Sequence, residues 1–217
     1  MTSPARPILL VTGGSRGIGA ATVRLAAERG YDVCVNYRAN AEAAARTVDE
    51  VRRAGARAVA VQADIAVEAD VVRMFETCDA QLGRVSALVN NAAIIETQSR
   101  LDAMDAARIA RVFGTNVTGA FLCSREAVRR MSSRYGGAGG AIVNVSSGAA
   151  RMGSPGEYID YAATKGALDT LTLGLAREVA TEGIRVNAVL AGHIYTELHA
   201  SGGEPNRVER EIGRAHV

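Results

Sequence analysis

The stretch TGGSRGIG, residues 12–19, decides the fold of this chain. It follows the apolar run ILLV at residues 8–11 and directly precedes a helical pattern. Glycine has no Cβ, so the backbone N–H groups of such a turn and of the following helix can approach an anion closely. Its glycines do not follow the common G-x-G-x-x-G pattern, since they stand at Gly13, Gly14, Gly17 and Gly19. The stretch predicts a phosphate-binding turn between a strand and a helix.

Short apolar runs alternate with helical patterns along the whole chain. The helical segment that begins near residue 40 places Ala44, Val48 and Val51 on one face, and the segment from 102 to 135 is interrupted near Gly114. Strands and helices that alternate in this way predict an α/β fold of the Rossmann type, a doubly wound parallel sheet flanked by helices. We expect residues 1–217 to form a single domain. The predicted strands are residues 8–12, 33–37, 58–62, 87–90, 141–146 and 184–189.

The composition is that of an ordinary globular chain. It has 217 residues, of which 48% are hydrophobic, and a formal net charge of +2. A charge this small favours a small-molecule substrate over nucleic acid or a membrane. The three cysteines, Cys34, Cys78 and Cys123, are too few and too scattered for a disulfide framework, so we expect them to be reduced core residues. Because no leader or long apolar segment is evident, we expect a cytoplasmic protein.

Polar residues follow each predicted strand at the point where it ends. Ligands of an open parallel sheet bind outside the carboxyl ends of its strands, so these residues should meet at one edge. Loops after six strands therefore converge on one predicted site. They begin at Thr12, Arg38, Asp64, Asn91, Ser147 and Gly192.

The stretch YAATK at residues 161–165 indicates the chemistry. Tyr161 and Lys165 are four residues apart, so on a helix they share a face and the ammonium lies beside the phenol. A nearby cation lowers the pKa of a phenol from about 10 toward neutral pH, which makes the phenol a usable acid or base. An isolated pair of this kind is usually only an exposed helix pair. Its place after the fifth strand favours the catalytic interpretation.

Together these motifs resemble the short-chain dehydrogenase/reductases, and in particular 3-oxoacyl reductases and sugar dehydrogenases. The resemblance rests on the order of TGGSRGIG, NNAA at residues 90–93, GTNVTGAF with Asn116, and YAATK. It implies that Tyr161 exchanges the proton at the substrate oxygen, and that Lys165 lowers its pKa and holds the nicotinamide ribose. It also implies that Ser147 binds the substrate oxygen, and that Asn116 breaks its helix and positions a water that links Lys165 to solvent.

Two choices within the resemblance depend on local geometry. Ser146 and Ser147 point to opposite faces of an extended strand, so only one faces the cleft, and we assign Ser147. Tyr158 is a competing phenol, but the residue four positions on is Ala162, which cannot shift a pKa. We expect Tyr158 to line the substrate side instead.

The cofactor is predicted from the charge after the second strand. An acidic residue there suits the ribose of NAD, whereas a basic residue suits the 2′-phosphate of NADP. Arg38 follows that strand and Arg16 lies in the glycine loop, so two guanidiniums could hold one phosphate. NADP is predicted, with NAD as the alternative. The expected cofactor-binding residues are Gly13, Ser15, Arg16, Gly17, Ile18, Gly19, Arg38, Asp64, Ile65, Asn91, Ala92, Ala93, Tyr161, Lys165, Gly192, Ile194 and Thr196.

The chain departs from the family pattern at Ala93, where relatives commonly have glycine, and at Ala191, where they usually have proline. Relatives also continue through a seventh strand, and we expect this chain to stop before it. The leading function is hydride transfer between NAD(P) and a carbonyl or alcohol carbon. The alternative is a non-catalytic dinucleotide-binding or assembly protein, inactive because of its shortened end.

Assembly and specificity are predicted from the remaining segments. The helices at 102–135 and 161–181 predict a homodimer or homotetramer, in which small or apolar residues allow close approach of two helices: Ala162, Ala163, Ala167 and Leu168. Substrate specificity is assigned to residues 151–158 and 192–205. No metal site is predicted, because no ligand spacing recurs around the three histidines, which we interpret as lid or surface residues: His193, His199 and His216.

Overall fold

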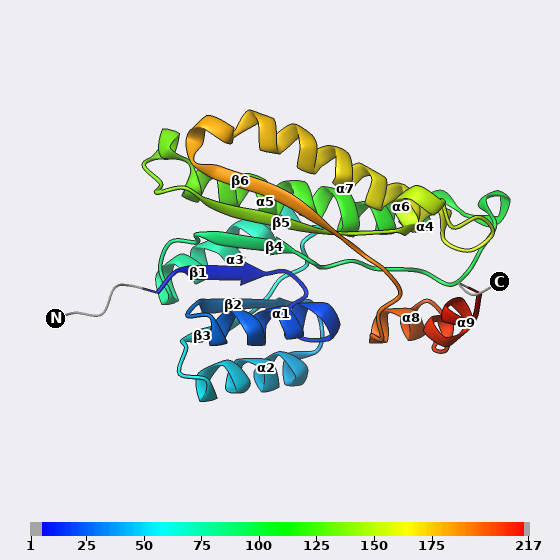
Figure 1. The fold of residues 1–217 in the computed structure, drawn as a ribbon, viewed down its shortest axis with the longest axis horizontal. Helices are drawn as coiled ribbons and strands as arrows, with labels where there is room; N and C mark the ends of the chain where they lie inside the picture. The colour runs from blue at the N-terminus through cyan, green and yellow to red at the C-terminus, as the bar shows by residue number, and fades with distance from the viewer. Residues whose placement is uncertain (1–5, 215–217) are drawn as a thin grey trace.

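The computed structural model describes residues 6–214, which form one parallel sheet with helices on both faces (Figure 1). The strand order is β3-β2-β1-β4-β5-β6, and every neighbouring pair is parallel. This confirms the predicted Rossmann-type fold. The strands are β1 (Ile8–Val11), β2 (Asp32–Tyr37), β3 (Ala58–Gln62), β4 (Ala87–Asn90), β5 (Gly140–Ser147) and β6 (Ile184–Ala191).

An apolar core lies between the sheet and its helices on each face of the sheet. On one face, α1 and α2 bury Val23, Val48 and Val51 against β1 and β2. On the other face, Phe75 from α3 and Cys123 from α5 pack in a larger core that also contacts α7. The helices are α1 (Gly17–Glu28), α2 (Ala41–Arg53), α3 (Glu68–Gln81), α4 (Ala106–Phe113), α5 (Gly119–Met131), α6 (Ala149–Met152), α7 (Ile159–Glu178), α8 (Glu197–Ser201) and α9 (Arg207–Arg214).

Polar side chains cap the first turns of two helices, α2 and α4. The Asn40 side chain accepts a hydrogen bond from the Ala43 amide at 2.9 Å, and Asp105 caps the Arg108 amide in the same way at 2.7 Å. These caps satisfy backbone donors that a helix cannot pair itself. They fix where α2 and α4 begin, close to the carboxyl ends of β2 and β4.

The predicted interruption near Gly114 is a π-helical turn, Gly114–Thr118, between α4 and α5. Single π-helical turns often occur at functional sites. Here Gly119 follows the turn directly, and a Cβ on it would lie 2.7 Å from the Ile65 side chain. The absence of a side chain at Gly119 therefore lets this helical segment pack closely against the loop after β3.

The strand order reverses direction between β1 and β4, which places a crevice at their carboxyl ends. Loops after all six strands reach this edge, and the last segment of the described chain, with α8 and α9, also lies beyond it (Figure 1). Open parallel sheets bind ligands at such a reversal. The fold therefore gathers the polar loop residues at one end.

Candidate active site

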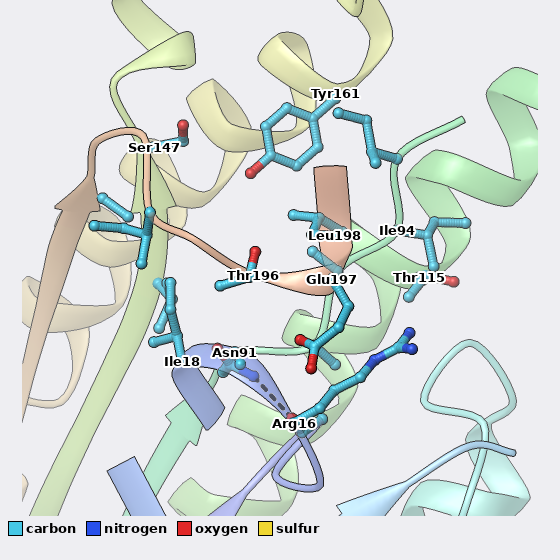
Figure 2. A pocket seen from close by; sticks show the side chains of 18 of the residues that line it. Arg16, Ile18, Asn91, Ile94, Thr115, Ser147, Tyr161, Thr196, Glu197 and Leu198 are labelled. Carbon is cyan, nitrogen blue, oxygen red and sulfur yellow. Dashed lines mark hydrogen bonds between the residues drawn. The ribbon is translucent and has the colours of Figure 1, made fainter. Parts of the chain in front are cut away.

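A cavity of about 330 Å³ lies at the carboxyl edge of the sheet. Figure 2 shows it between the glycine loop with Arg16, the α7 side chain of Tyr161 and the α8 segment with Thr196 and Glu197. Of the predicted site residues, only Gly19 and Asn116 do not line it. Those that do are Gly13, Ser15, Arg16, Gly17, Ile18, Arg38, Asp64, Ile65, Asn91, Ala92, Ala93, Ser147, Tyr161, Lys165, Gly192, Ile194 and Thr196.

The glycine loop has a backbone that only glycine fits well. Gly13 and Gly17 adopt φ of +61° and +52°, a region that residues with a Cβ rarely occupy. A Cβ on Gly19 would lie 2.3 Å from the Gly13 carbonyl oxygen. No side chain caps the first turn of α1, so its N–H groups face the cavity without a side-chain acceptor. A compact anion such as a diphosphate fits this cradle.

Buried polar side chains hold the loop in place. Thr12 Oγ1 accepts hydrogen bonds from the amides of Asn91 and Ala92, both at 3.0 Å, and Asn91 Nδ2 donates to the Thr12 carbonyl at 2.9 Å. Asn36 Oδ1 accepts from the Gly13 amide at 3.1 Å, while its Nδ2 donates to the Ala63 carbonyl at 3.0 Å. These contacts join the loops after β1, β2, β3 and β4. Asn36 was not predicted, although a lone amide in the apolar run VCVNY was a usable signal.

Tyr161 and Ser147 face each other across the substrate side of the cavity. Tyr161 lies in the first turn of α7 and Ser147 at the end of β5, and the Ser147 side chain lies close enough to lower the pKa of the phenol. Both point into the pocket in Figure 2. Ser146 instead is buried and donates to the Lys165 carbonyl at 3.3 Å. The structure thus places Ser147, and not Ser146, beside the phenol.

Lys165 lies beside the Tyr161 ring, but the pKa of the phenol is raised and not lowered as we predicted. Its Nζ donates to the Val145 carbonyl at 2.7 Å and stands 5.5 Å from the centre of the Tyr161 ring. Burial raises the pKa of Tyr161 above its usual value, and the Ser147 side chain and the charge of Arg207 only partly oppose this. Burial also lowers the pKa of Lys165 to about 8. The prediction was wrong because it counted the cation and ignored desolvation of the phenolate.

Asn116 lies within the π-helical turn, and its side chain hydrogen-bonds mainly to backbone groups. Its Oδ1 accepts from the Ile94 amide at 2.8 Å, and its Nδ2 donates to the Ile94 carbonyl at 2.9 Å and to Thr164 at 3.2 Å. It is 1% exposed. In this arrangement Asn116 fixes the loop after β4, which carries Ala93 and Ile94 along the cavity wall.

Two arginines line the cavity at the far side from Tyr161. Arg16 and Arg38 are both exposed, and neither side chain has an ion-pair partner among residues 6–214. The main chain of Arg38 is fixed by a hydrogen bond from Gln62 to its carbonyl at 3.0 Å. Asp64 accepts from the Ala66 amide at 3.0 Å and so closes its own loop. Both guanidiniums are free to meet an anion.

The segment after β6 supplies most of the lining that was not predicted individually. His193, Leu198, His199 and Arg207 come from it, and Met152 comes from α6. Both histidines fall within the predicted lid, whereas His216 lies outside the described residues. No sequence motif marked Arg207, because it reaches the cavity only through the course of the chain between β6 and α9.

Tyr158 does not line the cavity, which corrects our prediction. It is 1% exposed, its hydroxyl donates to the Gly202 carbonyl at 3.2 Å, and Arg207 stacks on its ring at 4.5 Å. The residue stands one position before α7, where its side chain turns into the interior. Tyr158 therefore contacts the segment after β6 from the protein interior, and Tyr161 is the phenol of α7 that lines the cavity.

Three further features bear on the class of site. Cys34, Cys78 and Cys123 are free and buried, as predicted. Among the described residues, no three His, Cys, Asp or Glu side chains gather as a metal site. No helix in residues 6–214 is long and apolar enough to cross a membrane.

Comparison with known proteins agrees with this geometry. Residues 7–206 match the family model for short chain dehydrogenases. The chain is 60% identical to oxidoreductase YgfF of Escherichia coli (strain K12), over 94% of this chain and 82% of that protein. It is 39% identical to the 3-oxoacyl-[acyl-carrier-protein] reductase FabG of Staphylococcus aureus (strain Mu50), over 87% of this chain and 75% of that protein.

Solved structures show the same architecture. A short chain dehydrogenase from Burkholderia cenocepacia J2315 in complex with NADP aligns with a TM-score of 0.86 and 33% identity, covering 98% of this chain and 84% of that one. A 3-ketoacyl-(acyl-carrier-protein) reductase from Brucella melitensis complexed with NADH aligns with a TM-score of 0.85 and 30% identity, covering 97% and 84%. With the family model matching nearly its whole length, the chain belongs to the short chain dehydrogenase family.

Proposed function

We propose that this protein is an NADP-preferring oxidoreductase that transfers hydride between the nicotinamide and a carbonyl or alcohol carbon. The observation that carries the proposal is the Tyr161 phenol, which lines with Ser147 a cavity whose other end is a glycine cradle. One end suits a dinucleotide phosphate and the other suits proton exchange. A substrate carbonyl between them would meet both.

The residues present fit a nicotinamide dinucleotide. Gly13 and Gly19 approach each other so closely that a Cβ at position 19 would clash with the Gly13 carbonyl. The first turn of α1, which no side chain caps, offers backbone N–H donors to phosphate. Arg16 and Arg38 would hold a 2′-phosphate by charge-assisted hydrogen bonds. Bound there, the dinucleotide supplies or takes up a hydride at the substrate carbon.

The protein's own groups handle the proton. Because burial raises the pKa of Tyr161, its phenol is protonated at neutral pH and can donate to the oxygen of a carbonyl as that carbon is reduced. Ser147 would hold the same oxygen by a hydrogen bond. Lys165, still mainly charged at pH 7 with a pKa of about 8, would stabilise the phenolate that remains. Lys165 is only 2% exposed, so its charge acts with little screening by water.

Supporting this proposal, the relatives are named as oxidoreductases and 3-oxoacyl reductases, and one similar structure is a complex with NADP. The test is NADPH oxidation at 340 nm against a panel of ketones, aldehydes and 3-oxoacyl thioesters. Turnover with NADPH that exceeds turnover with NADH supports the proposal. NADPH binding without turnover of any carbonyl would favour a non-catalytic dinucleotide-binding protein.

We also propose that the protein forms a dimer or tetramer through α5 and α7. Two of the four residues predicted for that contact, Ala162 and Leu168, are buried within the protomer and cannot meet a partner. The most exposed large apolar residues on these helices are instead Phe121 and Leu173, exposed by 50% and 54%. Light scattering of the wild type and of Phe121→Asp tests this. A mass unchanged by the substitution would contradict it.

A further inference from the structure

Arg207, the first residue of α9, is a buried arginine at the substrate side of the cavity. It is 9% exposed and lines the cavity together with Tyr161. Its Nε is buried without a hydrogen-bond partner. Buried guanidinium donors are costly to leave unpaired, and arginine is rarely buried without partners. A donor of this kind at the edge of a cavity indicates a missing acceptor.

The guanidinium is held in position by two contacts. Its face stacks on the Tyr158 ring at 4.5 Å, and its Nη2 donates to Glu157 at 3.2 Å. Glu157 is shared, because its other oxygen accepts from Arg210 at 2.9 Å. One carboxylate therefore serves two guanidiniums. Arg207 is preorganised but only partly neutralised, as expected of a group that awaits an anion.

His199 provides a second, independent observation at the same place. It also lines the cavity, and its Nε2 donates to the Ile194 carbonyl at 3.0 Å. Its Nδ1 is buried without a partner. Burial lowers the pKa of His199 and the charge of Arg207 adds to this, while the same charge partly opposes the burial that raises the pKa of Tyr161, so the guanidinium lies within electrostatic reach of both groups. Two residues that line the same cavity as Tyr161 thus each carry an unpartnered polar atom.

The acidic groups on the cavity wall lie elsewhere. Asp64 and Glu197 line the same cavity, but Asp64 lies on the loop after β3 and Glu197 lies above the glycine loop, where a Cβ on Gly17 would be 3.6 Å from its carboxylate. Figure 2 shows Glu197 on the Arg16 side, below Tyr161. The rest of the substrate side is apolar, with Ile94, Met152 and Leu198. The carboxylate that pairs with Arg207, Glu157 at 3.2 Å, does not line the cavity.

We propose that Arg207 forms a subsite for a carboxylate on the substrate, so that the preferred substrates are oxo acids whose carbonyl and carboxylate are separated by a short apolar chain. The guanidinium of Arg207 donates to the carboxylate while Tyr161 meets the carbonyl oxygen. This inference rests on the proposed function, because it assigns the substrate class of the same site. Arg207 is a binding residue and takes no part in proton transfer.

The experiment compares oxo acids with their methyl esters, which have the same carbonyl but no charge. The probes are 4-oxopentanoate and 5-oxohexanoate and their methyl esters, reduced with NADPH. The wild type is expected to favour at least one acid over its ester by tenfold or more in kcat/KM. Arg207→Gln should lower kcat/KM for that acid at least tenfold and change the ester less than about twofold. Arg207→Lys should retain part of the preference, since the charge is kept.

Arg210→Gln is the matched control, because Arg210 shares Glu157 but does not line the cavity. It should leave the preference for the acid unchanged. Melting temperatures of all three variants verify folding. Equal loss of acid and ester turnover in Arg207→Gln, or a wild type that treats acid and ester alike, would overturn the subsite and leave the oxidoreductase assignment standing.

A binding measurement separates the two proposals. Dissociation constants of the acids are measured by quenching of bound NADPH fluorescence in Tyr161→Phe, which retains the cavity, with and without Arg207→Gln. Acid affinity that falls tenfold with Arg207→Gln supports the subsite even where no substrate is turned over. Unchanged affinity would contradict it.

Discussion

Lys165 Nζ donates a hydrogen bond to the Val145 carbonyl at 2.7 Å while standing 5.5 Å from the centre of the Tyr161 ring. A cation is thus fixed between β5 and the phenol of α7, almost out of contact with water. Burial lowers its pKa to about 8, and the nearby Asp169 opposes that shift only in part. The stability of the protein is therefore coupled to the protonation of this amine.

The first prediction concerns stability against pH. Lysine in the unfolded chain has a pKa near 10.4, so between about pH 8 and 10.4 the unfolded state binds more protons and stability rises with pH. Relative to Lys165→Met, the wild type should gain up to about 3 kcal/mol across that range, since one pKa unit is about 1.4 kcal/mol. Urea unfolding of both proteins at pH 7, 8, 9 and 10 measures the difference. Parallel stability curves would mean that the amine is not desolvated as described.

A second prediction concerns the buried ion pair that supports the first turn of α7. Arg108 Nε donates to Asp160 at 2.8 Å, and the Asp160 carboxylate also accepts from the Tyr161 amide at 2.9 Å. Arg108→Met leaves this carboxylate buried without its cation and should cost about 3–5 kcal/mol of unfolding free energy. Adding Asp160→Asn should recover much of the loss, because it removes the stranded charge.

The matched control for that pair is the exposed ion pair of Arg46 and Glu42 on α2, whose side chains are 61% and 85% exposed. Arg46→Met should change stability by less than about 0.5 kcal/mol. Urea unfolding of the three variants provides the comparison. Similar losses for Arg46→Met and Arg108→Met would show that burial does not set the value of the Arg108 pair.

A third prediction concerns the glycine cradle. Gly19→Ala would bring a methyl group to 2.3 Å from the Gly13 carbonyl oxygen, so the loop must shift away from its cavity position. We expect NADPH affinity to fall at least tenfold, as measured by fluorescence titration. Gly174→Ala in α7 is the control, since its Cβ meets nothing within 4 Å and alanine favours helix by up to about 1 kcal/mol. Retained NADPH affinity in Gly19→Ala would remove the loop from the cofactor site.

A fourth prediction concerns coenzyme choice. Arg38→Asp removes a charge-assisted contact to a 2′-phosphate worth about 1.5–3 kcal/mol, so the NADPH to NADH ratio of kcat/KM should fall roughly 10- to 150-fold. Arg29→Asp makes the same charge change at an exposed site after α1, at the other end of the sheet, and should leave the ratio unchanged. If both variants behave alike, Arg38 does not select the coenzyme.

Much of the fold follows from local sequence, because buried parallel strands are short apolar runs and each is closed by a turn signal. All six predicted runs are strands, although β5 and β6 extend beyond the predicted ends, to Ser147 and Ala191. Those extra residues pair with each other as Ser147 and Ala191, which depends on a neighbouring strand and not on local hydrophobicity. Helix α7 also begins two residues earlier than predicted, at Ile159.

The sequence predicted those site residues that a strand end or a helix start places at the edge of the sheet. It did not predict the residues whose position depends on tertiary packing. Tyr161 and Ser147 line the same cavity, since the end of β5 and the start of α7 lie at the same edge of the sheet. The raised pKa of Tyr161 needed knowledge of burial, which spacing alone does not contain. Tyr158, which we expected at the cavity, is buried instead, and Arg207, which no motif marked, lines the cavity while stacking on the Tyr158 ring.

The most direct test of the central claim is turnover and cofactor binding in Tyr161→Phe, which removes one hydroxyl from the cavity. We predict that NADPH-dependent reduction of the best carbonyl substrate falls by at least a thousandfold while the NADPH dissociation constant stays within about threefold. Tyr135→Phe, on an exposed ring far from the cavity, should retain full activity. Reduction by Tyr161→Phe at a rate close to that of the wild type would contradict the assignment of Tyr161 as the proton donor.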